Sequence, residues 1–242
     1  MNSPFLARAV SFMRRVLAFD LVSRRRIFSM PVERLGSGEC GWIVPVGLPQ
    51  EGAVCFCFGA GEDITFDIAL AQSRRCVVHT FDPTPRAISH YASLSREERS
   101  AVTFHPVGIW KENRTMQFYA PAAQEHVSHS LVSLQTNTIG FSADCRTLGR
   151  LIEEIGAGAP QLLKMDIEGA EMHVMDDLLR TALPLLLLVE FDELTPLTST
   201  ANWGRVRDVV AAIVRNGYAI YALDRTNYCF IRRDVGATGD RS

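Results

Sequence analysis

The sequence predicts a single α/β domain built around a mostly parallel β-sheet. Short apolar runs alternate along the chain with segments of helical periodicity, which is the order expected of strand–helix–strand units. The chain has 242 residues, 47% of them hydrophobic, which is enough for one domain with a sizeable core. The strongest local signal is an apolar run at residues 53–58 followed by Gly59 and Gly61.

This run begins a strand–turn–helix unit. Ala53–Phe58 is short and rich in aromatic and thiol side chains, so we expect a strand that is buried on both faces. Gly59 and Gly61 let the chain turn sharply and leave space for a ligand against the backbone. From about residue 63 to residue 74, apolar residues recur at helical spacing. Such a unit binds nucleotide-like ligands in many parallel α/β sheets.

A second strand is expected at residues 76–81, and it ends in Asp82-Pro83. An acidic residue at this point, roughly 20 residues after the glycines, is placed to bond ribose hydroxyls. The alternative is that Asp82 only starts a turn or a helix, a role that Pro83 and Pro85 also suit. The order of strand, glycines, helix, strand and acid favours a cofactor site.

The type of cofactor follows from one missing glycine. A dinucleotide fingerprint has a third glycine three residues after the second, and Ile64 stands there. This residue disfavours NAD and FAD. S-Adenosylmethionine, an adenosyl ligand without a pyrophosphate, needs less of the phosphate-binding backbone.

The net charge and the cysteine spacing argue against two classes, nucleic-acid-binding proteins and proteins stabilised by disulfides or zinc. A formal net charge of −2 argues against bulk electrostatic binding of nucleic acid. Cys-x-x-Cys pairs do not occur, so we expect reduced core thiols in a cytoplasmic protein, with neither a disulfide framework nor a zinc site. The six cysteines are Cys40, Cys55, Cys57, Cys76, Cys145 and Cys229.

Residues 1–33 differ from the rest because arginines far outnumber acidic residues there. Apolar runs in this segment stay well short of the ~20 residues that a membrane span needs. Two interpretations remain open. The segment is either a helix packed on the domain with a solvated basic face, or a basic amphipathic segment that contacts membrane lipid peripherally.

The other elements follow from periodicity and from turn residues. We expect a Gly- and Pro-rich loop around a short strand at 42–44, a helix at 83–99, and strands at 102–109 and 115–119. An irregular polar stretch at 121–140 is followed by a helix at 148–155, a strand at 161–166 and a helix from about 169. A strand at 184–189, a helix at 203–215, and a hairpin of strands at 218–223 and 228–232 complete the order.

Two of these segments carry candidate catalytic groups. Asp166 ends a strand and Glu168 follows it, and the carboxyl ends of parallel strands are where open α/β sheets bind ligands. The alternative is a helix cap with favourable charges in the first turn. His126 and His129 lie in the polar stretch, which has the features of a functional loop, although two solvated histidines explain the pair more simply.

At this point the chain resembles the FkbM-type family of class I S-adenosylmethionine-dependent methyltransferases. The similarity covers about residues 38–233, and Leu162–Glu171 is its most specific part. Many members begin the first motif with Asp-Val-Gly-Ala-Asn, whereas Cys57–Gly61 lacks both the Asp and the Asn. The carrying residues are Phe58–Asp67, His79–Arg86, Pro106–Trp110, Val127–Leu134 and Leu162–Glu171.

The resemblance implies a single-domain, Rossmann-like class I fold with a seven-stranded, mostly parallel sheet and an antiparallel C-terminal hairpin. The catalytic candidates are Asp166, Glu168, His129 and His126. No metal site is predicted, and a divalent ion held by Asp166 and Glu168 stays open as an alternative. We expect a basic N-terminal extension at 1–37, the methyltransferase domain at 38–233 and a flexible tail at 234–242. The residues expected to bind the cofactor are Phe58, Gly59, Gly61, Glu62, Asp63, Asp82, Pro83 and Asp166.

The implied activity is methylation of a hydroxyl on a sugar, a glycolipid or a secondary metabolite, so the acceptor is a small molecule or is linked to a glycan or lipid. Two other functions remain open. The altered first motif is consistent with a binding or scaffold protein that keeps the fold without the chemistry. An NAD(P)-dependent oxidoreductase is the third alternative, and Ile64 disfavours it.

Overall fold

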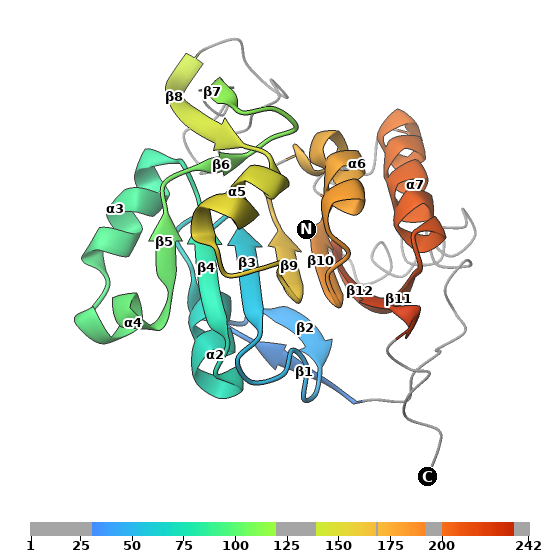
Figure 1. Cartoon of the computed structure of the whole chain (residues 1–242), viewed down its shortest axis with the longest axis horizontal. Coiled ribbons are helices and arrows are strands. Elements are labelled where there is room, and N and C mark those ends of the chain that lie inside the picture. Colours follow the sequence, from blue (N-terminus) through green and yellow to red (C-terminus); the bar gives the residue numbers. More distant parts are fainter. Residues whose placement is uncertain (1–30, 120–138, 168, 192–199, 235–242) are drawn as a thin grey trace, which may run out of the picture.

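The computed structural model describes residues 31–119, 139–167, 169–191 and 200–234. Its centre is a seven-stranded sheet in the order β11-β12-β10-β9-β3-β4-β5 (Figure 1). Strands β10, β9, β3, β4 and β5 are parallel, whereas β12 is antiparallel to β10 and to β11. The bounds are β3 Val54–Phe58, β4 Val77–Phe81, β5 Thr103–His105, β9 Leu162–Met165, β10 Leu186–Glu190, β11 Tyr218–Asp224 and β12 Asn227–Arg232. The predicted fold class is thereby confirmed.

Helices cover both faces of this sheet, and each face has its own apolar cluster. Because side chains alternate along a strand, Phe56 and Phe58 join the cluster under α5, α6 and α7, while Cys55 and Cys57 join the one under α2. The bounds are α2 Thr65–Arg74, α3 Pro85–Ser93, α4 Arg96–Ala101, α5 Leu148–Ile155, α6 Glu171–Thr181 and α7 Thr200–Arg215.

Two predicted elements are divided in the structure. The helix expected at 83–99 is two helices, α3 and α4, because Leu94 is extended (ψ 154°) and Ser95 forms a capping box with Glu98. The strand expected at 102–109 is also divided. Its first part is β5, and after Pro106 the chain enters a different sheet as β6.

That second sheet has three strands in the order β6-β8-β7, and it stands beyond the carboxyl edge of the central sheet (Figure 1). The bounds are β6 Gly108–Ile109, β7 Arg114–Tyr119 and β8 Ile139–Arg146. Strand β7 lies close to the predicted 115–119. The sequence analysis missed β8, because much of this segment is small or polar and it directly follows the long polar stretch.

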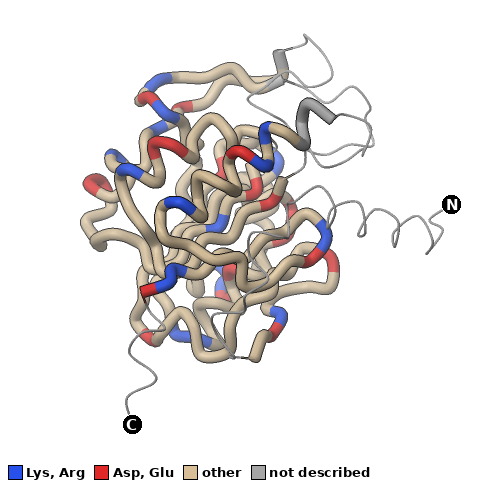
Figure 2. Tube along the Cα trace, turned by 90° about the vertical axis from the view of Figure 1, so that its right-hand side faces the viewer, with Lys and Arg blue, Asp and Glu red and all other residues tan. Residues whose placement is uncertain are grey.

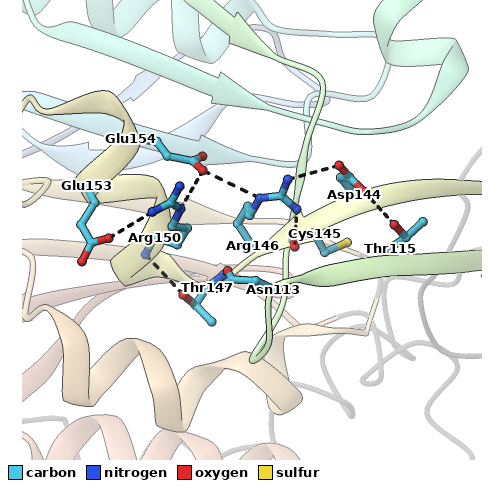
Figure 3. Close-up of polar contacts among 9 residues, drawn as sticks. All are labelled: Asn113, Thr115, Asp144, Cys145, Arg146, Thr147, Arg150, Glu153 and Glu154. Atoms are coloured by element: carbon cyan, nitrogen blue, oxygen red, sulfur yellow. Dashed lines mark hydrogen bonds and ion pairs between the residues drawn. The ribbon is translucent and has the colours of Figure 1, made fainter.

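A chain of polar contacts fastens the small sheet to α5 (Figure 3). Arg146 pairs with Asp144 (3.2 Å) and lies 3.9 Å from Glu154. Thr147 accepts a hydrogen bond from the Arg150 backbone at the start of α5. Since α5 packs on the central sheet through Leu148 and Leu151, these contacts fix the small sheet relative to the strand ends.

A hairpin of β1 (Val32–Leu35) and β2 (Trp42–Pro45) packs on the α2 face. Strand β2 matches the short strand predicted at 42–44, whereas β1 was not predicted. Within the described ranges, no helix combines the length and apolar composition needed to cross a bilayer. Acidic and basic residues lie interspersed along this part of the chain (Figure 2).

Candidate active site

A cavity of about 350 Å³ opens at the carboxyl ends of β3, β4 and β9. Ligand sites typically occupy ~300–1,000 Å³, and this edge is where open α/β sheets bind them. All eight residues expected to bind the cofactor line this cavity. The lining residues are Cys40, Phe58, Gly59, Ala60, Gly61, Glu62, Asp63, Phe81, Asp82, Pro83, Thr84, Arg86, Gly108, Ile109, Phe118, Lys164, Asp166, Ile167 and Glu190.

The glycine loop approaches β9 more closely than any side chain would permit. Gly59 has φ +85°, and a Cβ atom there would lie 1.7 Å from the carbonyl oxygen of Asp166. Gly61 also has positive φ (+53°), but a Cβ atom on it would have no neighbour within 4 Å. Gly59 therefore provides close backbone packing, whereas Gly61 provides the turn and leaves open space beside the cavity.

Asp82 holds this loop in place. Its Oδ2 accepts hydrogen bonds from the backbone N–H of Ala60 (2.9 Å) and of Gly61 (3.0 Å), and its Oδ1 accepts one from Thr84 (2.8 Å). The side chain is buried at the end of β4 and lines the cavity. Asp82 thus combines the turn-forming role with a position at which one of its oxygens can accept a further bond from a ligand hydroxyl.

Asp63 occupies the N-terminus of α2. Its carboxylate accepts hydrogen bonds from the backbone N–H of Thr65 (2.8 Å) and from the Ser37 hydroxyl (2.8 Å). Partial burial works against ionisation, but these bonds outweigh it and hold the pKa of Asp63 below its ordinary value. In a dinucleotide fold, pyrophosphate lies against such a helix start. Here the two carboxylates, Asp63 and Asp82, already occupy those backbone donors.

The end of the cavity under the small sheet is apolar. Phe118 of β7 stacks on Phe141 of β8, with ring centroids 4.7 Å apart, and reaches the cavity beside Ile109. A Cβ atom at Gly108 would lie 2.8 Å from the Cys145 sulfur, so glycine permits close packing there. Together with Pro83, these side chains form walls suited to a flat, weakly polar ring.

Lys164 is a buried cation beneath the glycine loop. Its Nζ donates a hydrogen bond to the Gly59 carbonyl (2.6 Å), lies 3.6 Å from Asp166 Oδ2 and is 5.9 Å from the Trp42 ring centroid. Burial lowers the pKa of Lys164, but the carboxylates of Asp166 and Asp67 outweigh it, so the net shift is upward. Lys164 therefore supports both the loop and the acidic strand end.

Asp166 and Glu190 form a carboxyl pair at the ends of two neighbouring parallel strands. The register aligns Met165 with Val189, so the next residues, Asp166 and Glu190, lie side by side. Burial, together with the adjacent Asp166 carboxylate, raises the pKa of Glu190 to about 7. A carboxyl group that titrates in this range can act as a proton acceptor at neutral pH.

Three of the four predicted catalytic residues, His126, His129 and Glu168, lie outside the described residues. The fourth, Asp166, lines the cavity. In the part of the chain that the structure describes, no group of three or more His, Cys, Asp or Glu side chains is arranged to hold a metal ion.

The sequence analysis did not place several cavity residues in the site. A signal was present for two of them. Glu190 ends an apolar strand as Asp166 does, and Lys164 is a charge within a run that is otherwise apolar. Four more, Ala60, Phe81, Thr84 and Ile167, are chain neighbours of predicted site residues. Local pattern carried no such signal for the other five, because the long-range packing of the small sheet and of the loops brings them in. These residues are Cys40, Arg86, Gly108, Ile109 and Phe118.

Solved structures include two of low similarity to this chain. Fibrillarin, a pre-rRNA processing protein of Methanococcus jannaschii, is 9% identical, with a TM-score of 0.44 over 87% of this chain and 85% of its own. The TYW2 protein of M. jannaschii, solved in complex with AdoMet, is 10% identical, with a TM-score of 0.37 over 85% and 88%. The curated proteins include no match.

A family model gives the specific match. The model described as the methyltransferase FkbM domain matches residues 57–218, which include the end of β3 with its glycine loop, Asp82, Lys164, and the carboxyl pair at the ends of β9 and β10. The match covers well over half of the 242 residues. The chain therefore belongs to the FkbM methyltransferase family.

Proposed function

We propose that the protein is an S-adenosylmethionine-dependent methyltransferase that methylates a hydroxyl oxygen on a small acceptor. The observation that carries the choice of cofactor is the state of the glycine loop. Its N–H groups bond Asp82, and the first turn of α2 bonds Asp63, so the chain's own negative charges occupy the region where a pyrophosphate would lie. These carboxylates favour a nucleoside ligand without phosphates over NAD(P).

Different parts of the cavity suit different parts of this cofactor. The apolar end formed by Pro83, Ile109 and Phe118 suits an adenine ring. Asp82 lines the cavity, which supports its predicted role in bonding the ribose hydroxyls. The space left open by Gly61, near Asp166, suits the methionine part. When bound, the cofactor supplies an electrophilic methyl group on a positively charged sulfur.

The acceptor class rests on the family and on the acidic strand ends. A hydroxyl must lose its proton as it takes the methyl group, and Asp166 and Glu190 place carboxylates in the cavity for this purpose. We infer a hydroxyl on a sugar, a glycolipid or a secondary metabolite. The scaffold alternative predicts cofactor binding without turnover on any such acceptor.

Calorimetric titration tests the proposed cofactor directly. We expect S-adenosylmethionine to bind the full-length protein with micromolar affinity, and NADH and NADPH to show no binding under the same conditions. Equal or tighter binding of a nicotinamide nucleotide would contradict the proposal. The absence of heat with all three ligands would also contradict it and would favour a scaffold role.

Replacing Asp82 with asparagine should weaken cofactor binding about 10- to 100-fold, because charge-assisted hydrogen bonds contribute ~1.5–3 kcal/mol and each ~1.4 kcal/mol is tenfold. Asparagine has one acceptor oxygen in place of two, so the loop contacts and the ribose contact are both impaired. Asp208→Asn is the matched control, since Asp208 is exposed and does not line the cavity. If Asp82→Asn binds as wild type does, Asp82 is not a cofactor residue.

A further inference from the structure

The carboxyl pair at the ends of β9 and β10 is more closely coupled than two neighbouring surface acids. Asp166 and Glu190 extend from adjacent strands in register, on the same face of the sheet, and both line the cavity. Burial and the neighbouring Asp166 carboxylate both raise the pKa of Glu190. Two carboxylates side by side cannot both ionise without a cost, so the Glu190 carboxyl group favours holding a proton.

Charged and polar side chains from β9, α2 and the β11–β12 turn surround the carboxyl pair. Lys164 of β9 is the nearby cation, and it is shared with buried Asp67 of α2. Thr226, in the β11–β12 turn, donates a hydrogen bond to Glu190 Oε1 (2.8 Å). The same turn carries Arg225, which pairs with Glu39, and follows Asp224, which pairs with Arg34. One lysine thus faces three carboxyl groups, which leaves negative charge uncompensated at the cavity.

Thr226 shows how Glu190 is oriented. Because its hydroxyl binds Oε1, the other oxygen of Glu190 remains for Asp166 or for a ligand. Asn227 of β12 lies opposite Glu190 of β10 in the antiparallel pairing of these strands. Its buried Oδ1 has no hydrogen-bond partner among the described residues. A buried acceptor without a partner on the strand residue opposite Glu190 is compatible with a protonated Glu190.

On the basis of the proposed function, we propose that the Asp166–Glu190 pair holds one proton in the free protein and releases it when a cationic sulfonium ligand binds. Glu190 then takes up the proton of the acceptor hydroxyl. Cofactor binding thereby prepares the base. In the later step the O–H bond of the acceptor breaks, its electron pair forms the bond to the methyl carbon, and its proton moves to a Glu190 oxygen. The sulfur keeps the electrons of the broken S–C bond, so charge balances.

The sign of the pH dependence follows from this exchange. A proton must leave for the cation to bind, so cofactor affinity should rise about tenfold per pH unit below the pKa of Glu190 and become flat above it. S-Adenosylhomocysteine has the same amino acid and nucleoside parts but an uncharged thioether. Its affinity should therefore change much less with pH, and the difference between the two ligands isolates the sulfonium charge.

The experiment is calorimetric titration at pH 6 and pH 8, in buffers with different enthalpies of ionisation, which gives the number of protons released on binding. For the wild-type protein at pH 6 we expect close to one proton released with S-adenosylmethionine, and close to zero with S-adenosylhomocysteine. At pH 8 both values should be near zero.

Two variants make the assignment specific. Glu190→Gln keeps the acceptor for Thr226 but cannot hold the proton, so it should bind S-adenosylmethionine with no proton release at pH 6. Thr226→Val removes the hydrogen bond that lowers the pKa of Glu190, so the pH at which release stops should move upward. A carbon-13 titration of the glutamate carboxyl groups in the free protein reads the same pKa without any ligand.

The outcomes separate the two hypotheses. Binding of S-adenosylmethionine without proton release at pH 6, or release that is unchanged in Glu190→Gln, would overturn the shared-proton inference and leave the cofactor assignment intact. If S-adenosylmethionine does not bind at all, the proposed function fails. In that case the carbon-13 titration still decides whether Glu190 titrates well above an ordinary glutamate.

Discussion

Gly59→Ala is expected to lower the free energy of unfolding by more than about 3 kcal/mol. A methyl group at this position would lie 1.7 Å from the carbonyl oxygen of Asp166 and 2.7 Å from its carbonyl carbon, which are backbone atoms of the residue that directly follows central strand β9. Overpacking of this kind costs ~1–3 kcal/mol or more, and a left-handed φ adds ~1–2 kcal/mol for a residue with a Cβ atom. Urea denaturation monitored by circular dichroism measures the loss.

Gly158→Ala is the matched control for Gly59→Ala. Gly158 has the same φ of +85°, but a Cβ atom on it would meet no atom within 4 Å. This substitution should therefore cost only the conformational strain, about 1–2 kcal/mol. Equal losses in the two variants would show that the contact between the glycine loop and β9 is not closely packed, contrary to the structure.

The second large effect is expected at Lys164. Lys164→Met fills a similar volume but removes the cation that faces Asp166 and Asp67, and it also removes the hydrogen bond to Gly59. Breaking a buried ion pair by deleting one partner costs ~3–5 kcal/mol, because the remaining charge is left uncompensated. We expect a loss of this size in chemical denaturation at pH 8.

The pH dependence of this loss identifies its cause. Without Lys164, the pKa of buried Asp67 rises further above its unfolded value, since Lys164 is the charge that opposes desolvation there. An acid whose folded pKa is raised destabilises the protein as pH increases, so the Lys164→Met defect should be smaller at pH 5 than at pH 8. Adding Asp67→Asn should restore part of the stability at pH 8. A defect independent of both pH and Asp67 would point to packing instead.

The sequence predicts those parts of the site that depend on short-range pattern. Gly59, Gly61 and Asp82 could be predicted because strand, turn and acid follow one another along one βαβ unit, and this order determines where they meet. Asp166 could be predicted because it ends a second apolar strand, and parallel strands bring their carboxyl ends to one edge.

The sequence could not predict the features that depend on packing between distant segments. Phe118 reaches the cavity only because β7 pairs with β8, a strand with too weak a pattern to be found. The sequence marks Lys164 as a charge in an apolar run close to Asp166, but it gives no sign of the partners on α2 and in the glycine loop. Pro106 stands within the single strand predicted at 102–109, and only the structure shows that the chain changes sheets there.

The hydrogen bonds from Ala60 and Gly61 to Asp82 have a consequence for how fast and how tightly a ligand is captured. Flexible binding loops must be ordered on association, which costs conformational entropy and slows productive encounters. Here the loop is already ordered in the folded protein, so binding does not carry that entropic cost. We therefore expect association to proceed without a rate-limiting loop rearrangement, so that residence time, rather than capture, distinguishes one adenosyl ligand from another.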